Sequence, residues 1–219
     1  MKKLAAIALS LVLAFTCAFA LAEGNSKILD AEQLDAIFTE MLIGVIDVSR
    51  YEQTSSSLTS DHRLEKVVKK AEVDGTTLEL GMSFKEVLAA GIVAPDGFAD
   101  EEGHERLSTY TDFRTKAGNK VELGFSVKKD GDKLSDGTLC RINRYEFYKK
   151  NPADVVIGGI SVGSDLSALV GVFGSPREIA LDGQYLKLRY EYRDDTVYEA
   201  VRVWIDTDGK VAGLGLEGN

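Results

Sequence analysis

Cysteine and histidine are both scarce in this 219-residue chain. The two cysteines are Cys17 and Cys140, and the two histidines are His62 and His104. A zinc site needs about three or four closely spaced ligands, and no such cluster occurs. No nucleophile elbow accompanies the histidines, and Gly-x-Gly-x-x-Gly and phosphate-loop motifs are lacking. We therefore predict no metal, no cofactor and no catalytic residues.

Positive charge is also in short supply. The chain has 26 Lys and Arg against 35 Asp and Glu, which gives a net charge of −9. Nucleic-acid phosphates and anionic lipids would be repelled by such a surface, so neither is an expected partner. The acidity suits a basic partner or simple solubility, and solubility is the favoured interpretation.

Only the first segment, "MKKLAAIALSLVLAFTCAFALAEG", contains a long hydrophobic run. Lys2 and Lys3 precede the run, and Ala20-Leu21-Ala22 supplies small residues before Glu23. This order is typical of a secretory signal peptide. We predict that residues 1–22 are a signal peptide and that the protein is exported, to the periplasm, the cell envelope or the medium. A membrane anchor is the alternative, because the run approaches the ~18 residues of a minimal span.

Cleavage after Ala22 would leave 197 residues and, with Lys2 and Lys3 removed from a charge of −9, a net charge of −11. Only Cys140 would remain, so an intramolecular disulfide is excluded and the core alone must stabilise the fold. Cys140 lies in the strand-like stretch "GTLCRINRYEF", which predicts a buried structural thiol. Lipidation of Cys17 is a second alternative, although Ala14-Phe15-Thr16 suits a lipobox poorly.

Residues 23–62 are predicted to form an amphipathic helix followed by a Ser/Thr-rich linker. A capping box at Asp30–Gln33 begins the helix, and its apolar residues recur every three or four positions. The stripe consists of Leu34, Ile37, Phe38, Met41, Leu42 and Val45. We expect it to pack on the body of the protein, with binding of a partner as the alternative.

Residues 63–150 are predicted to form a first unit of one short helix and three strands. The Asp74-Gly75 turn lies between two extended pieces, although residues 63–71 fit either a helix or a strand. Ser83 and Glu86 form a capping box for a helix that buries Phe84 and Val87. The three strands are "STYTDFRT", "NKVELGFSVKKD" and "TLCRINRYEFYK".

Residues 151–219 repeat that order. Asp165 is predicted to cap a short helix that ends at Gly174, and three alternating strands follow: "QYLKLRYEYR", "VYEAVRVWID" and "KVAGLGLEG". Aligning Gly81 with Gly163 places cap on cap and apolar residue on apolar residue, which favours a duplication. The predicted fold class is α+β: two repeats of a short helix plus a three-stranded antiparallel sheet, preceded by the N-terminal helix.

The stretches "GMSFKEVLAAG" and "VGSDLSALVGVFGSP", each ahead of a meander, resemble the SmpA/OmlA family of outer-membrane-assembly lipoproteins. In that family a Gly-x-Ser/Thr helix start leads into a three-stranded sheet. A tandem of such units is also similar to the secreted β-lactamase-inhibitor proteins, and the second half is similar to short repeats of exported bacterial proteins. The resemblance covers residues 76–219 and implies architecture, with a sheet face that holds another macromolecule. The chain departs from the inhibitors in lacking a disulfide pair and from the lipoproteins in its poor lipobox.

Acidic clusters are common in the sequence, but their spacing is that of turns and loops. "DGDKLSD" and "DTDG" do not continue into a twelve-residue calcium loop, and the acids of residues 96–105 are expected on a solvated loop. A glycosidase would need two carboxylates in one cleft. A cell-wall or polysaccharide hydrolase is therefore the alternative function.

The last meander carries the candidate binding residues. Tyr190 and Tyr192 share a strand face with leucines, so we expect them in the core. The opposite face combines aromatic and Arg side chains, the composition of protein recognition surfaces. The predicted contacts are Tyr185, Arg189, Arg193, Tyr198 and Trp204. The sequence thus favours a secreted or envelope-associated, non-enzymatic module that binds another protein through a sheet face. A purely structural surface domain is the third possibility.

Overall fold

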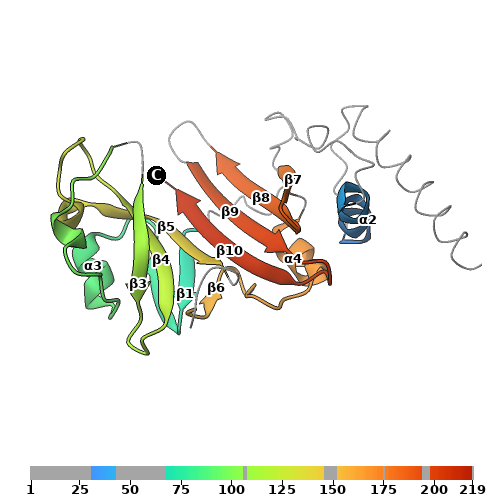
Figure 1. Ribbon diagram of the computed structural model, residues 1–219, viewed down its shortest axis with the longest axis horizontal. Coiled ribbons are helices and arrows are strands. Elements are labelled where there is room, and N and C mark those ends of the chain that lie inside the picture. Colours follow the sequence, from blue (N-terminus) through green and yellow to red (C-terminus); the bar gives the residue numbers. More distant parts are fainter. Residues whose placement is uncertain are drawn as a thin grey trace, which may run out of the picture.

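Most of the described chain is β-strand. The structure is a computed structural model, and it describes residues 31–42, 68–105, 108–145, 152–174, 176–193 and 198–218. The strands form a seven-stranded antiparallel sheet of order β3-β4-β5-β10-β9-β8-β7 and a three-stranded sheet of order β2-β1-β6. Figure 1 shows their arrangement. The strands are β1 Lys70–Val73, β2 Thr76–Glu79, β3 Thr109–Arg114, β4 Lys120–Ser126, β5 Thr138–Tyr145, β6 Val155–Val156, β7 Glu178–Asp182, β8 Tyr185–Arg193, β9 Tyr198–Ile205 and β10 Val211–Gly218.

The predicted α+β fold of two helix-plus-three-strand repeats is wrong. β10 pairs with β5, with Leu216 opposite Ile142, so strands from both predicted units belong to one continuous sheet. The second unit also contributes a fourth strand, β7, and the short β6 pairs with β1 in the other sheet. Alternation along the chain indicates single strands, but it does not reveal which distant strands exchange hydrogen bonds.

The helices are short and make up a minor part of the described chain. They are α2 Ala31–Leu42, α3 Phe84–Ala89, α4 Leu166–Phe173 and the 3₁₀ turns η4 Phe98–Asp100 and η5 Leu134–Asp136. The capping box of α3 is confirmed: the Glu86 carboxylate accepts from the Ser83 N–H at 2.7 Å, and the Ser83 hydroxyl accepts from the Glu86 N–H at 3.3 Å. Asp165 precedes α4 but makes no side-chain cap; its carboxylate accepts from Lys210 Nζ at 2.6 Å.

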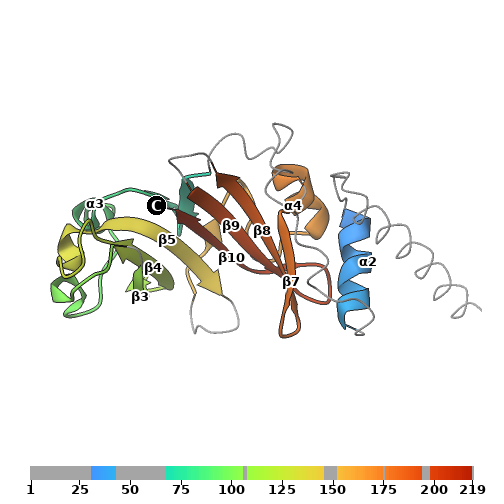
Figure 2. The same ribbon diagram turned by 90° about the horizontal axis from the view of Figure 1, so that it is seen from above.

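One face of the large sheet is apolar and is covered. Phe113, Phe125 and Tyr190 lie on this face, where Phe84 of α3 contacts Phe125 at 5.3 Å between ring centroids and Phe173 of α4 contacts Tyr190 at 5.4 Å. Residues of the small sheet belong to the same core. Figure 2 shows α3, α4 and the small sheet on one side of the large sheet. The core therefore lies between that sheet and these covering elements.

Hydrogen bonds to the Asp74 side chain hold the small sheet against the β3–β4 turn. The Asp74-Gly75 turn between β1 and β2 is confirmed, with Asp74 at φ 47°. The Asp74 carboxylate accepts hydrogen bonds from Thr115 at 2.6 Å, Asn119 at 3.0 Å and the Asp154 N–H at 2.8 Å. Burial favours a higher pKa for Asp74, but these donors outweigh it and hold the pKa below the ordinary value of 3.8.

Several predicted segments lie outside the described residues. They include the signal peptide at residues 1–22, Cys17 and the linker through His62. Within α2, Leu34 and Phe38 are buried, and the helix contacts α4 and β7. The predicted packing of this helix on the body of the protein is thus confirmed. None of the described helices combines the length and apolarity needed to cross a bilayer.

Candidate binding face

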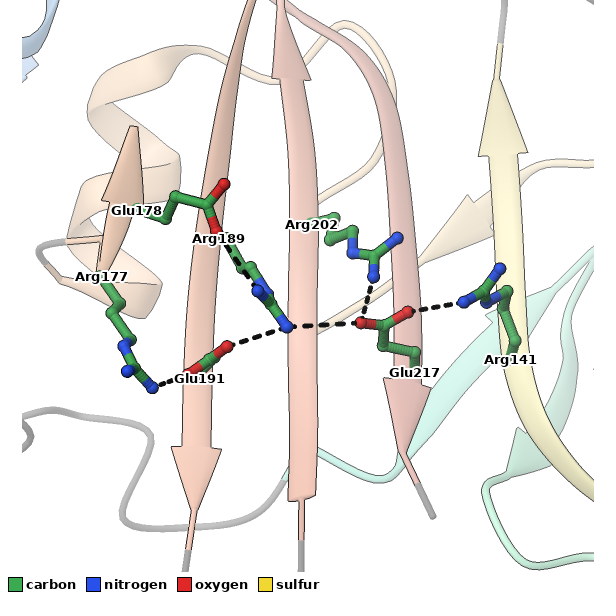
Figure 3. Close-up of polar contacts among 7 residues, drawn as sticks. All are labelled: Arg141, Arg177, Glu178, Arg189, Glu191, Arg202 and Glu217. Carbon is green, nitrogen blue, oxygen red and sulfur yellow. Dashed lines mark hydrogen bonds and ion pairs between the residues drawn. The ribbon is translucent and has the colours of Figure 1, made fainter. Parts of the chain in front are cut away.

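The second face of the large sheet is polar, and the strand registers define it. Arg189 lies opposite Arg202 between β8 and β9, and Arg202 lies opposite Gly215 between β9 and β10. Gly215 in turn lies opposite Asn143 of β5, which is paired with Glu122 of β4. We call this side of β7, β8, β9, β10, β5, β4 and β3 the polar face. In Figure 3 its charged side chains stand on the side of the strands away from α4.

Four arginines and three glutamates form one connected ion network there (Figure 3). Glu217 pairs with Arg141 at 3.0 Å, with Arg202, and with Arg189 at 3.8 Å. Arg189 also reaches Glu191 at 2.8 Å and Glu178 at 3.2 Å. Arg177 completes the network by pairing with Glu191. These side chains come from both predicted units, and the pairing of β5 with β10 brings them together.

The acids and the arginines of this network differ in exposure. The side chains of Glu191 and Glu217 are 5% and 10% exposed, whereas those of Arg141, Arg189 and Arg202 are 23–25% exposed. Glu191 and Glu217 thus lie deeper than these three arginines, whereas the third carboxylate, Glu178, is 32% exposed. The network carries one more positive than negative charge, although the whole chain has a net charge of −9. The network is therefore a patch of slight positive charge on an acidic protein.

Glycines on the central strands make room for these flat-lying side chains. A Cβ atom at Gly215 would lie 2.2 Å from the Asn143 Oδ1 atom, and one at Gly124 would lie 3.0 Å from the Arg141 Cβ. Asn143 is buried and donates to Glu122 at 2.7 Å. Beside it, the Arg141 guanidinium lies 5.3 Å from the ring centroid of Tyr110, a cation–π contact. Tyr110 is 54% exposed.

The five predicted contact residues have different environments. Arg189 lies at the centre of the network, and Tyr185 is half-buried and accepts a hydrogen bond from Gln184. Arg193 and Tyr198 pair through their backbones at the ends of β8 and β9, but their side chains lie outside the described residues. Trp204 is only 3% exposed.

The burial of Trp204 differs from the exposed position that strand alternation predicts for it. The residue does point to the polar face, where it lies opposite Lys187 and Gly213. Its indole N–H reaches across β8 and donates to the Asp182 carboxylate at 2.8 Å. The ring is therefore part of the floor of this face and offers little area to a partner.

Sequence reasoning missed most of the network. Arg141, Arg202 and Glu217 alternate with apolar residues on their own strands, so each was identifiable as outward-facing. What the sequence could not show is that these strands are neighbours. Tyr110 was missed because β3 is an edge strand whose pattern is irregular, with only Phe113 fully buried.

The described residues also include Cys140 and His104, which the sequence analysis considered as candidates for chemistry. Cys140 is buried at a bulge in β5, its thiol donates to the Gly124 carbonyl at 3.4 Å, and burial raises its pKa. His104 lies on the surface, 3.7 Å from Asp130. No group of three or more potential metal ligands occurs in the described part of the chain.

The comparisons with family models, curated proteins and solved structures find no match to this chain. The resemblance to SmpA/OmlA proteins therefore stays a prediction made from two short sequence stretches.

Proposed function

We propose that this protein is an exported, non-enzymatic binding module that docks another protein on the polar face of its large sheet. The observation that carries the proposal is the connected Arg–Glu network on the face of the large sheet opposite to α3 and α4 (Figure 2). Side chains in such a network are held in place before a partner arrives, so less conformational entropy is lost on binding.

The composition of the face supports a protein as the partner. Arginine and tyrosine are the residues that protein interfaces enrich and that dominate their binding energy. Tyr110 supplies an exposed aromatic ring, and Arg141 beneath it supplies a planar cation. The N-terminal sequence supports export, because residues 1–22 have the pattern of a signal peptide.

No observation favours a hydrolase. Glycoside cleavage needs a carboxyl group whose pKa is raised. Three of the described carboxyl groups, those of Asp74, Glu86 and Asp100, have a lowered pKa instead. The lowered values of Glu86 and Asp100 come from the α3 cap and from Lys133, respectively.

The test is a capture experiment with mature protein as bait, applied to envelope and medium fractions of the source organism. We expect wild type to retain a protein that the double variant Arg141→Ala/Arg202→Ala releases. The matched control is Lys70→Ala/Lys133→Ala, which removes two positive charges from exposed side chains elsewhere. This control should retain the same protein.

Thermal unfolding of each bait checks that the variants are folded. Tyr110→Ala, which removes an exposed ring, provides a second disruption with little cost to folding. Equal recovery of every captured protein by wild type, both face variants and the control would overturn the proposal.

A further inference from the structure

Glu217 is surrounded by more positive charge than one carboxylate can neutralise. It pairs with three arginines, and Arg189 shares its charge with Glu178 and Glu191 as well. Within the described residues, Arg141 and Arg202 form ion pairs with Glu217 alone. The junction of β5, β10 and β9 is therefore the part of the network with the largest excess of positive charge.

Arg141 is also incompletely satisfied as a hydrogen-bond donor. Its Nε–H is buried and has no acceptor among the described residues. Such a donor loses its hydration without full compensation, while the rest of the guanidinium stays accessible, with the side chain 23% exposed. A further carboxylate placed above it would lower the electrostatic energy of the cluster.

The geometry points to a carboxylate-binding site: we propose that Arg141 and Arg202 bind Asp or Glu side chains of an acidic segment of the partner protein. This inference rests on the proposed function and names the chemistry of the partner. The segment would lie over the junction of β5, β10 and β9, with Tyr110 at one flank. Guanidinium groups suit this role because their planar forks donate two hydrogen bonds to one carboxylate.

A short acidic segment fits this surface better than an extended polyanion does. Beyond the network the chain is strongly acidic. Charges repel over about one Debye length, ~8 Å at physiological ionic strength. A segment confined to the arginines stays within their field, whereas a nucleic acid would extend past them over acidic surface.

The probe for the test is an oligoglutamate peptide, compared with oligoglutamine and oligolysine of the same length. Binding is followed on the wild-type protein through the side-chain Nε–Hε NMR signals of the arginines. The titration starts at low ionic strength, about 20 mM, where screening is weak. We expect oligoglutamate to shift the Arg141 and Arg202 signals saturably, and oligoglutamine and oligolysine to leave them in place.

Variants then test whether Arg141 and Arg202 contribute to oligoglutamate binding. Arg141→Gln/Arg202→Gln should weaken oligoglutamate binding about tenfold, the size expected when two close charge contacts are lost. The control Lys70→Gln/Lys133→Gln loses the same charge away from the face and should bind within about twofold of wild type. The single variant Arg202→Gln serves if the double variant does not fold.

Two results would overturn the inference: unshifted Arg141 and Arg202 signals in wild type, or equal weakening by the face and control variants. These outcomes are distinguishable from failure of the proposed function. If captured protein still depends on the face while oligoglutamate does not bind, docking stands and the carboxylate chemistry is wrong. If capture is independent of the face, the proposed function itself fails.

Discussion

The two faces of the large sheet are both well covered, but by different means. On β8, Tyr190 is 1% exposed beneath Phe173 of α4, while its neighbour Glu191 is covered by Arg189 of the same strand and by Arg177, just before β7. The helices α3 and α4 and the small sheet cover the apolar face, and the hydrophobic effect stabilises these contacts. On the polar face, side chains cover one another through ion pairs. A partner could form further ion pairs with these side chains or replace existing ones. The first face therefore accounts for stability, and the second is the candidate for recognition.

The largest expected effect comes from a matched pair on β3. Phe113 is fully buried against Phe84, Phe98 and Phe125, whereas Tyr110 on the same strand is exposed on the polar face. Phe113→Ala should lower the free energy of unfolding by about 3–5 kcal/mol, and Tyr110→Ala by under about 1 kcal/mol. Urea unfolding measures both, and similar losses would remove the contrast between the faces.

A second comparison concerns the carboxylate that three arginines share. Glu217→Gln keeps the shape but leaves Arg141 and Arg202 without their anion, so we expect a loss of about 1–3 kcal/mol for this partly screened site. The control is Glu79→Gln, which breaks an exposed pair with Lys70 and should cost under about 1 kcal/mol. If Glu217→Gln costs no more than the control, the network is only a set of surface pairs.

The smallest effect concerns the Asp74 hydrogen bonds, which hold the small sheet against the β3–β4 turn. Asp74→Asn keeps a residue suited to the left-handed turn but removes the charge that Thr115, Asn119 and the Asp154 N–H stabilise. We expect a loss of about 0.5–1 kcal/mol near neutral pH. Chemical denaturation at a series of pH values measures it.

The sign of this pH dependence follows from the lowered pKa of Asp74. The stabilisation is fully present above the unfolded-state value of 3.8 and disappears as the pH falls through the lower folded-state pKa. The difference between wild type and Asp74→Asn should therefore shrink below about pH 4. A difference that stays constant across the acid range would show that the charge of Asp74 does not contribute.

Local features of the fold were predictable because they depend on neighbours in sequence. The Asp74-Gly75 turn, the Ser83–Glu86 cap and the alternation of Leu186, Leu188 and Tyr190 all appear in the structure. In contrast, β7 was missed, and so was the pairing of Leu216 with Ile142 that merges the strands into one sheet. Pairing between strands is decided by packing over the whole sheet, which a single sequence does not display.

The candidate site was predictable only in part for the same reason. Arg189 was selected correctly as a residue of the polar face, but two of its partners, Glu178 of β7 and Glu217 of β10, come from other strands (Figure 3). Glu217 in turn pairs with Arg141 of β5 and Arg202 of β9. Trp204 was expected to be exposed because its strand alternates, yet its hydrogen bond to Asp182 holds it in the floor. Alternation along a strand predicts which residues share a face of the sheet. How far each side chain protrudes from that face depends on its contacts with side chains of neighbouring strands.

Site-specific photo-crosslinking tests most directly whether the polar face is the docking surface. The photoreactive residue p-benzoylphenylalanine replaces Tyr110 on the polar face or Val172 on α4, which covers the opposite face; both positions are exposed. Each protein is irradiated in the fraction that yields the captured protein. The account predicts a crosslinked partner from position 110 and none from position 172. Crosslinking of that partner from position 172 but not from position 110 would contradict it.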